Sequence, residues 1–169
     1  GWLRAAVLGG TLMVVAPLTA LAAAAPPCLA PPVAGEVVDP FRAPECPYCA
    51  GNRGIELRTA PGTSVTAAAA GTVTFAGTVA GVHYVVIDHG EGFRTTYGRL
   101  DRPVVRAGER VDRGARIGAA GSATFFGLRL GDDYLDPAPL IGTVTVLPQL
   151  VPLDGIDRRP RRPGRLSCP

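Results

Sequence analysis

The sequence contains no lysine, so all 17 of its basic residues are arginine. Histidine occurs only at His83 and His89, and aromatic residues make up 6% of the chain. The net charge is +3, and most of it would disappear with the arginine-rich C-terminal tail. A charge of this size and placement does not create the broad positive field that nucleic-acid binding requires, so no nucleic-acid partner is expected.

Long uninterrupted helical patterns are also missing, because the chain carries 22 glycines and 17 prolines. Between residues 51 and 152 the pattern is instead one of short, apolar, β-branched segments separated by glycine turns. These segments include "SVTAAAAGTVTFAGTV", "HYVVIDHGEGFRTTYGRL" and "ATFFGLRLGDDYLDP". Strands of this length and spacing predict an all-β domain, mainly antiparallel and sandwich- or barrel-like. "DHGEGF" predicts a hairpin loop in which Gly90 and Gly92 can take positive φ angles.

The chain divides into four parts by composition. Residues 1–25 are apolar after Arg4 and end in alanines, which is typical of a signal peptide cleaved after Ala22 or Ala25 or of an uncleaved membrane anchor. Residues 26–50 form a Pro/Ala-rich linker that is too rich in proline for regular structure. Residues 153–169 form an Arg/Pro-rich tail that is expected to be irregular unless Cys168 fixes it. The N-terminal segment predicts a secreted or cell-envelope protein that meets a membrane only through that segment.

The four cysteines form an even set, and in an exported protein disulfides are their expected state. Three pairings are possible. We favour Cys46–Cys49 as a local link and Cys28–Cys168 as a link between the two ends of the chain. The motif "CPYC" also has the spacing of redox-active dithiols. No βαβ pattern surrounds it, which favours a structural disulfide.

The ordered motifs "GNRGIEL", "TTYGRL" and "TFFGLRLGDDYLDP" resemble those of the LytM/lysostaphin-type zinc endopeptidases, which cut peptidoglycan peptides. The resemblance covers residues 51–140. It implies a lipoyl-like barrel-sandwich hybrid with an antiparallel sheet groove and zinc on the groove floor. Family frame residues are kept at Gly51, Arg53, Gly54, Tyr97, Gly127, Tyr134 and Asp136.

The chemistry-bearing positions of that family are substituted here. The family's zinc histidine, aspartate and second histidine correspond to Asn52, Glu56 and Phe125, and its two catalytic histidines to Arg99 and Ala123. Phenylalanine offers no lone pair, and arginine cannot act as a base near neutral pH. The resemblance therefore implies a degenerate member, with no zinc cofactor expected. The residues expected to line its groove are Asn52, Glu56, Tyr97, Arg99 and Phe125, with Glu56 and Arg99 forming an ion pair where zinc would lie.

The function expected from this pattern is a non-catalytic, exported protein that binds peptidoglycan or regulates a cell-wall hydrolase. One alternative is an active zinc endopeptidase with displaced ligands, for which His83 and His89 with Asp88 or Glu91 are the remaining donors. A lipoyl or biotinyl carrier shares the "VTAAAAGTV" strand style. The absence of a modifiable lysine excludes that carrier function.

Overall fold

The computed structural model describes residues 28–46, 48–145 and 165–167. They form eleven strands and one short 3-10 helix, η1 (Ala138–Leu140), and these ranges contain no α-helix. Within the same ranges, no helix has the length and hydropathy that crossing a bilayer requires. The expected signal peptide or anchor lies outside the described residues. The predicted all-β class is confirmed.

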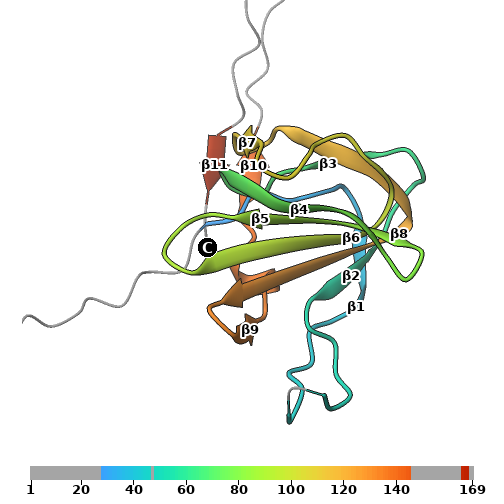
Figure 1. Cartoon of the computed structure of the whole chain (residues 1–169), viewed down its shortest axis with the longest axis vertical. Coiled ribbons are helices and arrows are strands. Elements are labelled where there is room, and N and C mark those ends of the chain that lie inside the picture. Colours follow the sequence, from blue (N-terminus) through green and yellow to red (C-terminus); the bar gives the residue numbers. More distant parts are fainter. Residues whose placement is uncertain (1–27, 47, 146–164, 168–169) are drawn as a thin grey trace, which may run out of the picture.

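Nine strands form one antiparallel sheet (Figure 1). Its main path runs in the order β1 (Glu36–Asp39), β2 (Ile55–Arg58), β8 (Arg116–Leu130), β6 (Phe93–Pro103), β5 (Val82–Asp88), β4 (Gly71–Val79) and β7 (Arg110–Val111). Two further strands, β3 (Ser64–Thr66) and β9 (Asp133–Leu135), both pair with β8. A separate two-stranded ladder consists of β10 (Thr143–Thr145) and β11 (Arg165–Ser167).

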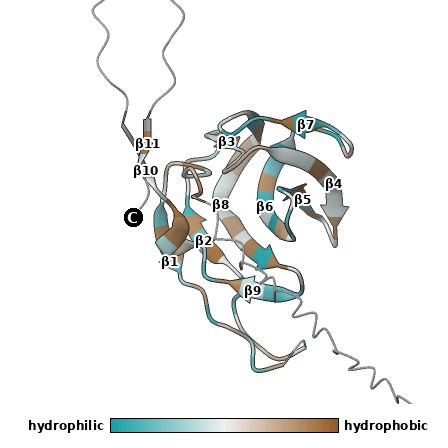
Figure 2. Cartoon of the chain, turned by 90° about the vertical axis from the view of Figure 1, so that its left-hand side faces the viewer, coloured by the Kyte–Doolittle hydropathy of each residue, from teal (hydrophilic) through white to brown (hydrophobic). Residues whose placement is uncertain are grey.

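The long strand β8 pairs with four other strands of the sheet. Its first part pairs with β3 and with the end of β6, and its second part pairs with β2, β6 and β9. The β6–β8 register shifts on both sides of Leu100. Such bulges bend a strand and increase its twist. The sheet therefore curls, with β1 and β2 at one side and β4 and β7 at the other (Figure 2).

Strand alternation separates the core from the outer face of the curled sheet. In β6, Phe93, Thr95 and Tyr97 are buried. Arg94 and Thr96 lie between them and point to the opposite face, as the two-residue period of a strand requires. The core is completed by apolar side chains from the other strands and from the N-terminal segment: Leu29, Val33, Ile55, Leu57, Val65, Val73, Val85, Ile87, Ile117, Phe126 and Leu128.

The predicted hairpin between β5 and β6 is confirmed. Gly90 and Gly92 have φ angles of 84° and 82°, and the Phe93 N–H donates to the Gly90 carbonyl over 2.9 Å. These angles lie in the left-handed region, which favours glycine because it lacks a Cβ.

The expectation that residues 26–50 lack regular structure is wrong. The stretch "EVVD" pairs with β2 as β1, and Leu29 is fully buried and bridges to Ile141. Proline weakens a strand only where it removes a ladder hydrogen bond. Here the prolines flank "EVVD" on both sides, so β1 forms between them.

The described part of the C-terminal tail is also regular, because Arg165–Ser167 forms β11 against β10. The predicted Cys46–Cys49 disulfide is present, with the two sulfur atoms 2.15 Å apart. Cys28 is disulfide-bonded as well. Cys168 lies outside the described residues, so its pairing with Cys28 remains a prediction.

Candidate peptide-binding groove and degenerate metal site

Asn52, the first position that the family resemblance equates with a zinc ligand, is engaged by backbone carbonyls at and just after the end of β1. Its side chain is only 8% exposed, and Nδ2 donates to the carbonyls of Pro40 at 3.1 Å and Asp39 at 3.3 Å. The backbones of Asn52 and Arg42 also exchange two hydrogen bonds of 2.9 Å each. The amide therefore fixes the entry to β2, and its predicted place on the groove surface is wrong.

The second degenerate position, Glu56, forms the expected ion pair with Arg99. Glu56 Oε1 lies 2.7 Å from Arg99 Nη2, and the glutamate side chain is 20% exposed. β2 aligns Glu56 with Phe125 of β8, while Arg99 occupies the β6 bulge between Gly98 and Leu100. The bulge places Arg99 at a φ of 57° and aims its guanidinium at the carboxylate.

A second arginine–carboxylate pair lies beside the first. Asp39, which faces Glu56 across β1 and β2, accepts two hydrogen bonds from the Arg42 guanidinium. These bonds, with the attraction of the positive charge, hold the pKa of Asp39 below its usual value, and the charge of Arg99 adds to the effect. The pKa of Arg42 is raised by the same hydrogen bonding to Asp39. Both carboxylates here are therefore occupied by guanidinium partners.

The third position, Phe125, fills space rather than offering a ligand atom. Its half-buried ring lies on Gly54 and Gly127, where a Cβ would come within 2.7 Å and 3.1 Å, respectively, of the ring atom Cζ. Ala123, at the position of one family catalytic histidine, has no titratable group.

Zinc requires thiolate, imidazole or carboxylate donors, usually three from the protein in a catalytic site. An engaged amide, one ion-paired carboxylate and a phenyl ring do not fit that requirement. No cluster of three potential metal ligands occurs elsewhere in the described part of the chain.

The two histidines do not provide a displaced site. His83 lies in β5 and His89 directly follows its end, six residues further on, which corresponds to about 20 Å in extended chain. His83 Nδ1 contacts the Leu100 carbonyl at 3.2 Å, and His89 Nδ1 contacts the Ala70 carbonyl at 2.8 Å. The alternative metal site that uses both histidines is therefore wrong. Two side chains on the same face of a strand can still lie too far apart to bind one ion.

Tyr97 is a core residue, so its predicted place in the groove is wrong. The side chain is fully buried, and its hydroxyl accepts hydrogen bonds from the Ala68 N–H at 2.7 Å and from Thr95 Oγ1 at 3.1 Å. Burial raises the pKa of Tyr97 to about 12. Thr95 Oγ1 also lies 2.7 Å from His89 Nε2, which extends the network to the end of β5.

Three rows of residues cross the outer face of the sheet, each with one residue from β8, β6, β5 and β4. The row beside the degenerate motif contains Phe125, Gly98, Tyr84 and Gly77. The middle row contains Gly127, Thr96, Val86 and Phe75. The third row contains Arg129, Arg94, Asp88 and Thr72. The middle row is therefore bordered by aromatic side chains on one side and by charged side chains on the other.

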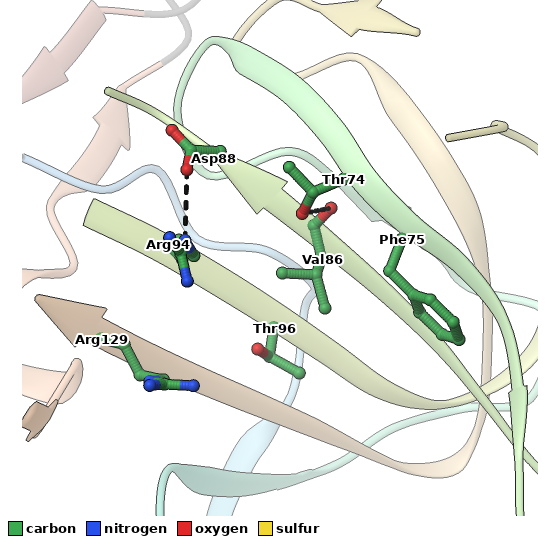
Figure 3. Close-up of a pocket in the computed structure, with 7 residues that line it drawn as sticks. All are labelled: Thr74, Phe75, Val86, Asp88, Arg94, Thr96 and Arg129. Carbon is green, nitrogen blue, oxygen red and sulfur yellow. Dashed lines mark hydrogen bonds and ion pairs between the residues drawn. The ribbon is translucent and has the colours of Figure 1, made fainter. Parts of the chain in front are cut away.

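The middle row forms the floor of a shallow groove with three connected cavities. One of about 350 Å³ is drawn in Figure 3 with its lining residues Thr74, Phe75, Val86, Asp88, Arg94, Thr96 and Arg129. A neighbouring apolar cavity of about 310 Å³ is lined by Phe75, Val79, Tyr84, Val86 and Thr96. A third, of about 200 Å³, is lined by Arg53, Thr96, Phe125, Gly127, Leu128, Arg129 and Tyr134. Thr96 lines all three and lies at their junction.

Most of this groove was not among the residues predicted to form a site. The alternation in "HYVVID" places Tyr84, Val86 and Asp88 on one strand face, which is a usable signal. Which face remains open depends on how the sheet curls and on the registers between strands. Single-strand patterns do not contain that information.

The sequence profile of Peptidase family M23 matches residues 50–134, about half of the chain. The chain therefore belongs to peptidase family M23, and the resemblance to LytM-type domains is confirmed.

Among curated proteins, the chain is 34% identical over 146 residues to an uncharacterised protein of Mycobacterium tuberculosis (strain ATCC 25618 / H37Rv), covering 77% of this chain and 55% of that protein. It is 28% identical over 120 residues to the murein hydrolase activator NlpD of Escherichia coli (strain K12), covering 70% of this chain and 31% of that protein. The chain thus spans about half or less of the length of these relatives.

Two solved structures carry the same fold. Csd3 of Helicobacter pylori superposes with a TM-score of 0.62 at 25% identity, covering 69% of this chain and 35% of that chain. The catalytic domain of the antimicrobial peptidase lysostaphin from Staphylococcus simulans superposes with a TM-score of 0.55 at 20% identity, covering 62% of this chain and 90% of that chain. The predicted lysostaphin-type all-β fold is confirmed for the residues that the structure describes.

Proposed function

We propose that this chain is a non-catalytic M23 domain of the cell envelope that binds peptidoglycan peptides in its sheet groove. The observation that carries the proposal is the 2.7 Å ion pair between Glu56 and Arg99 at the degenerate metal position. A zinc hydrolase needs an ion held by protein ligands with one open position for an activated water. In this chain an internal ion pair takes the place of that arrangement.

The two positions equated with the family's catalytic histidines also lack a group suited to proton transfer. An arginine side chain is not a general base, and the methyl side chain of Ala123 has no exchangeable proton. The chain therefore binds its ligand without cleaving it.

The dimensions of the groove support an extended peptide as the ligand. β8, β6, β5 and β4 lie about 4.8 Å apart, so the groove is about 14 Å long across the strands. This length corresponds to about four residues of extended chain. The groove floor consists of Gly127, Thr96 and Val86, which are uncharged and have no large side chain. This floor suits a ligand with small side chains such as alanine.

A protein partner is proposed in addition, because NlpD is described as a murein hydrolase activator. We propose that the chain binds a wall hydrolase while its groove holds the peptide. A purified wall amidase should then release more soluble fragments from sacculi in the presence of the chain. An unchanged rate of release would remove the regulatory part of the proposal and leave the binding part.

The binding proposal is tested by co-sedimentation of the purified chain with insoluble peptidoglycan sacculi. We expect the chain in the pellet and no soluble peptides in the supernatant. Val86→Arg, which places a long charged side chain on the groove floor, should lower binding at least tenfold. Val104→Arg is the matched control, because Val104 is 49% exposed and lies outside the groove. Failure of the wild-type chain to sediment, or release of peptides that stops with a chelator, would contradict the proposal.

A further inference from the structure

Two arginines stack on one tyrosine at the β8–β9 end of the groove. The guanidinium carbon of Arg129 lies 5.0 Å from the centre of the Tyr134 ring, and that of Arg53 lies 5.4 Å from the same ring. Arg53 Nη2 also donates to the Cys49 carbonyl at 3.3 Å, so the Cys46–Cys49 disulfide loop helps to hold that guanidinium in place. The two cations are thus fixed before any ligand arrives.

The charge around this site is mixed, because Glu45, Asp132 and Asp133 line a neighbouring cavity of about 650 Å³ that also contains Arg129 and Tyr134. The described residues that line the cavity of about 200 Å³ include both arginines and Thr96 but no carboxylate. Arg94 lies directly across from Arg129 on β6, and like charges facing each other across strands are unfavourable. Arg94 is compensated by Asp88 at 3.2 Å.

The existing partner of Arg129 leaves part of its hydrogen-bonding capacity unused. Nη2 contacts Asp132 at 2.9 Å, but the Asp132 side chain is fully exposed and held weakly in water. Arg129 Nε is buried and has no hydrogen-bond partner among the described residues. Buried polar groups are normally paired, so this nitrogen is an unsatisfied donor in the folded chain.

We propose that Arg129, Arg53 and Tyr134 form a carboxylate subsite that holds an anionic end of a peptide lying in the groove. Guanidiniums bind carboxylates through paired N–H···O bonds, and the cavity opens at Thr96 onto the peptide-sized groove. This inference rests on the proposed function and adds to it the ligand's charge, the position of its anionic group and its orientation across the sheet. A carboxylate is favoured over a phosphate polymer because the rest of the groove floor is apolar and strand-spanning.

The inference is tested by the affinity of the intact chain for a peptidoglycan stem tetrapeptide, measured by isothermal titration calorimetry. The two probes are the peptide with free carboxyl groups and the same peptide with all its carboxyl groups amidated. Charge-assisted hydrogen bonds predict that the wild-type chain binds the free acid at least tenfold more tightly. Equal affinity for the two probes would overturn the inference.

Variants test whether the preference for the free-acid peptide comes from the proposed subsite. Arg129→Gln and Arg53→Gln should each lower affinity for the free acid severalfold or more and leave affinity for the amide unchanged. Arg129→Lys keeps the positive charge but loses the paired N–H donors of the guanidinium, so it should retain only part of the preference for the free-acid peptide. Arg102→Gln removes an exposed arginine elsewhere on β6 and should behave like the wild type. If the arginine variants keep the full preference for the acid, the carboxylate binds elsewhere and the subsite is wrong.

Failure of this inference differs from failure of the proposed function. If the chain sediments with sacculi but does not discriminate between the two peptides, the groove binds peptides and the carboxylate subsite is absent. If sedimentation and both peptide titrations fail, the proposed function itself is wrong. If inorganic phosphate displaces the wild-type chain from sacculi at concentrations where acetate does not, the subsite prefers phosphate, and its assignment to a carboxylate is wrong.

Discussion

Arg99 shows how a single residue contributes to both the strain and the charge pattern of the degenerate site. Its φ of 57° lies in the left-handed region, which costs a non-glycine residue roughly 1–2 kcal/mol. The ion pair with the half-buried Glu56 offsets part of that cost. A partly exposed pair of this kind is worth about 0.5–1 kcal/mol.

Substitution of Arg99 separates the two effects. Arg99→Ala loses the ion pair and keeps the unfavourable φ, so the free energy of unfolding should fall by about 0.5–1 kcal/mol. Arg99→Gly loses the same pair but tolerates the backbone angle, so its stability should lie above that of Arg99→Ala and close to the wild type. Urea-induced unfolding measures both variants. A glycine variant less stable than the alanine variant would show that the backbone angle carries no strain.

At the scale of elements, the hairpin of β5 and β6 is joined to the segment before β4 by one hydrogen-bond network. His89 contacts the Ala70 carbonyl at 2.8 Å and Thr95 Oγ1 at 2.7 Å, and Thr95 continues to Tyr97 and the Ala68 backbone. Burial lowers the pKa of His89, while the hydrogen bond to Ala70 and the charge of Asp88 oppose the shift. The folded hairpin therefore favours the neutral form of the His89 imidazole.

This shift predicts a pH-dependent stability. Because the pKa of His89 in the folded state is lower than the ordinary histidine value of 6.5, the unfolded chain takes up the proton first as pH falls. The contribution is fully present above pH 6.5 and is lost as pH falls from there through the folded-state pKa. His89→Gln should lose less unfolding free energy than the wild type between pH 7 and pH 5, measured by urea titration at each pH. Parallel losses in the two proteins would exclude His89 as the source.

An element could be predicted from the sequence where its own residues determine its conformation, and could not where its pairing with another strand does. The β5–β6 hairpin was predictable because Gly90 and Gly92 supply the angles that its turn needs. β1 was missed because prolines dominate its surroundings, and only its pairing with β2 shows that "EVVD" completes the sheet.

At the scale of the whole molecule, the family motifs predicted the Glu56–Arg99 ion pair but not the surroundings of the other equated positions. The pairing of Glu56 with Arg99 followed from equating them with family positions. The inward turn of Asn52 towards the Pro40 carbonyl and the burial of Tyr97 follow from tertiary packing, which the motifs do not encode. The open groove likewise follows from the curl of the sheet.

The proposed absence of zinc binding is tested most directly by the zinc content of the purified chain after incubation with zinc and desalting. The positive control is the variant Asn52→His, Glu56→Asp, Arg99→His and Phe125→His, which restores the family donors and removes the competing guanidinium. We predict a zinc ratio near zero for the wild-type chain and near one for the folded variant. A ratio near one for the wild-type chain would contradict the non-catalytic function proposed for this domain.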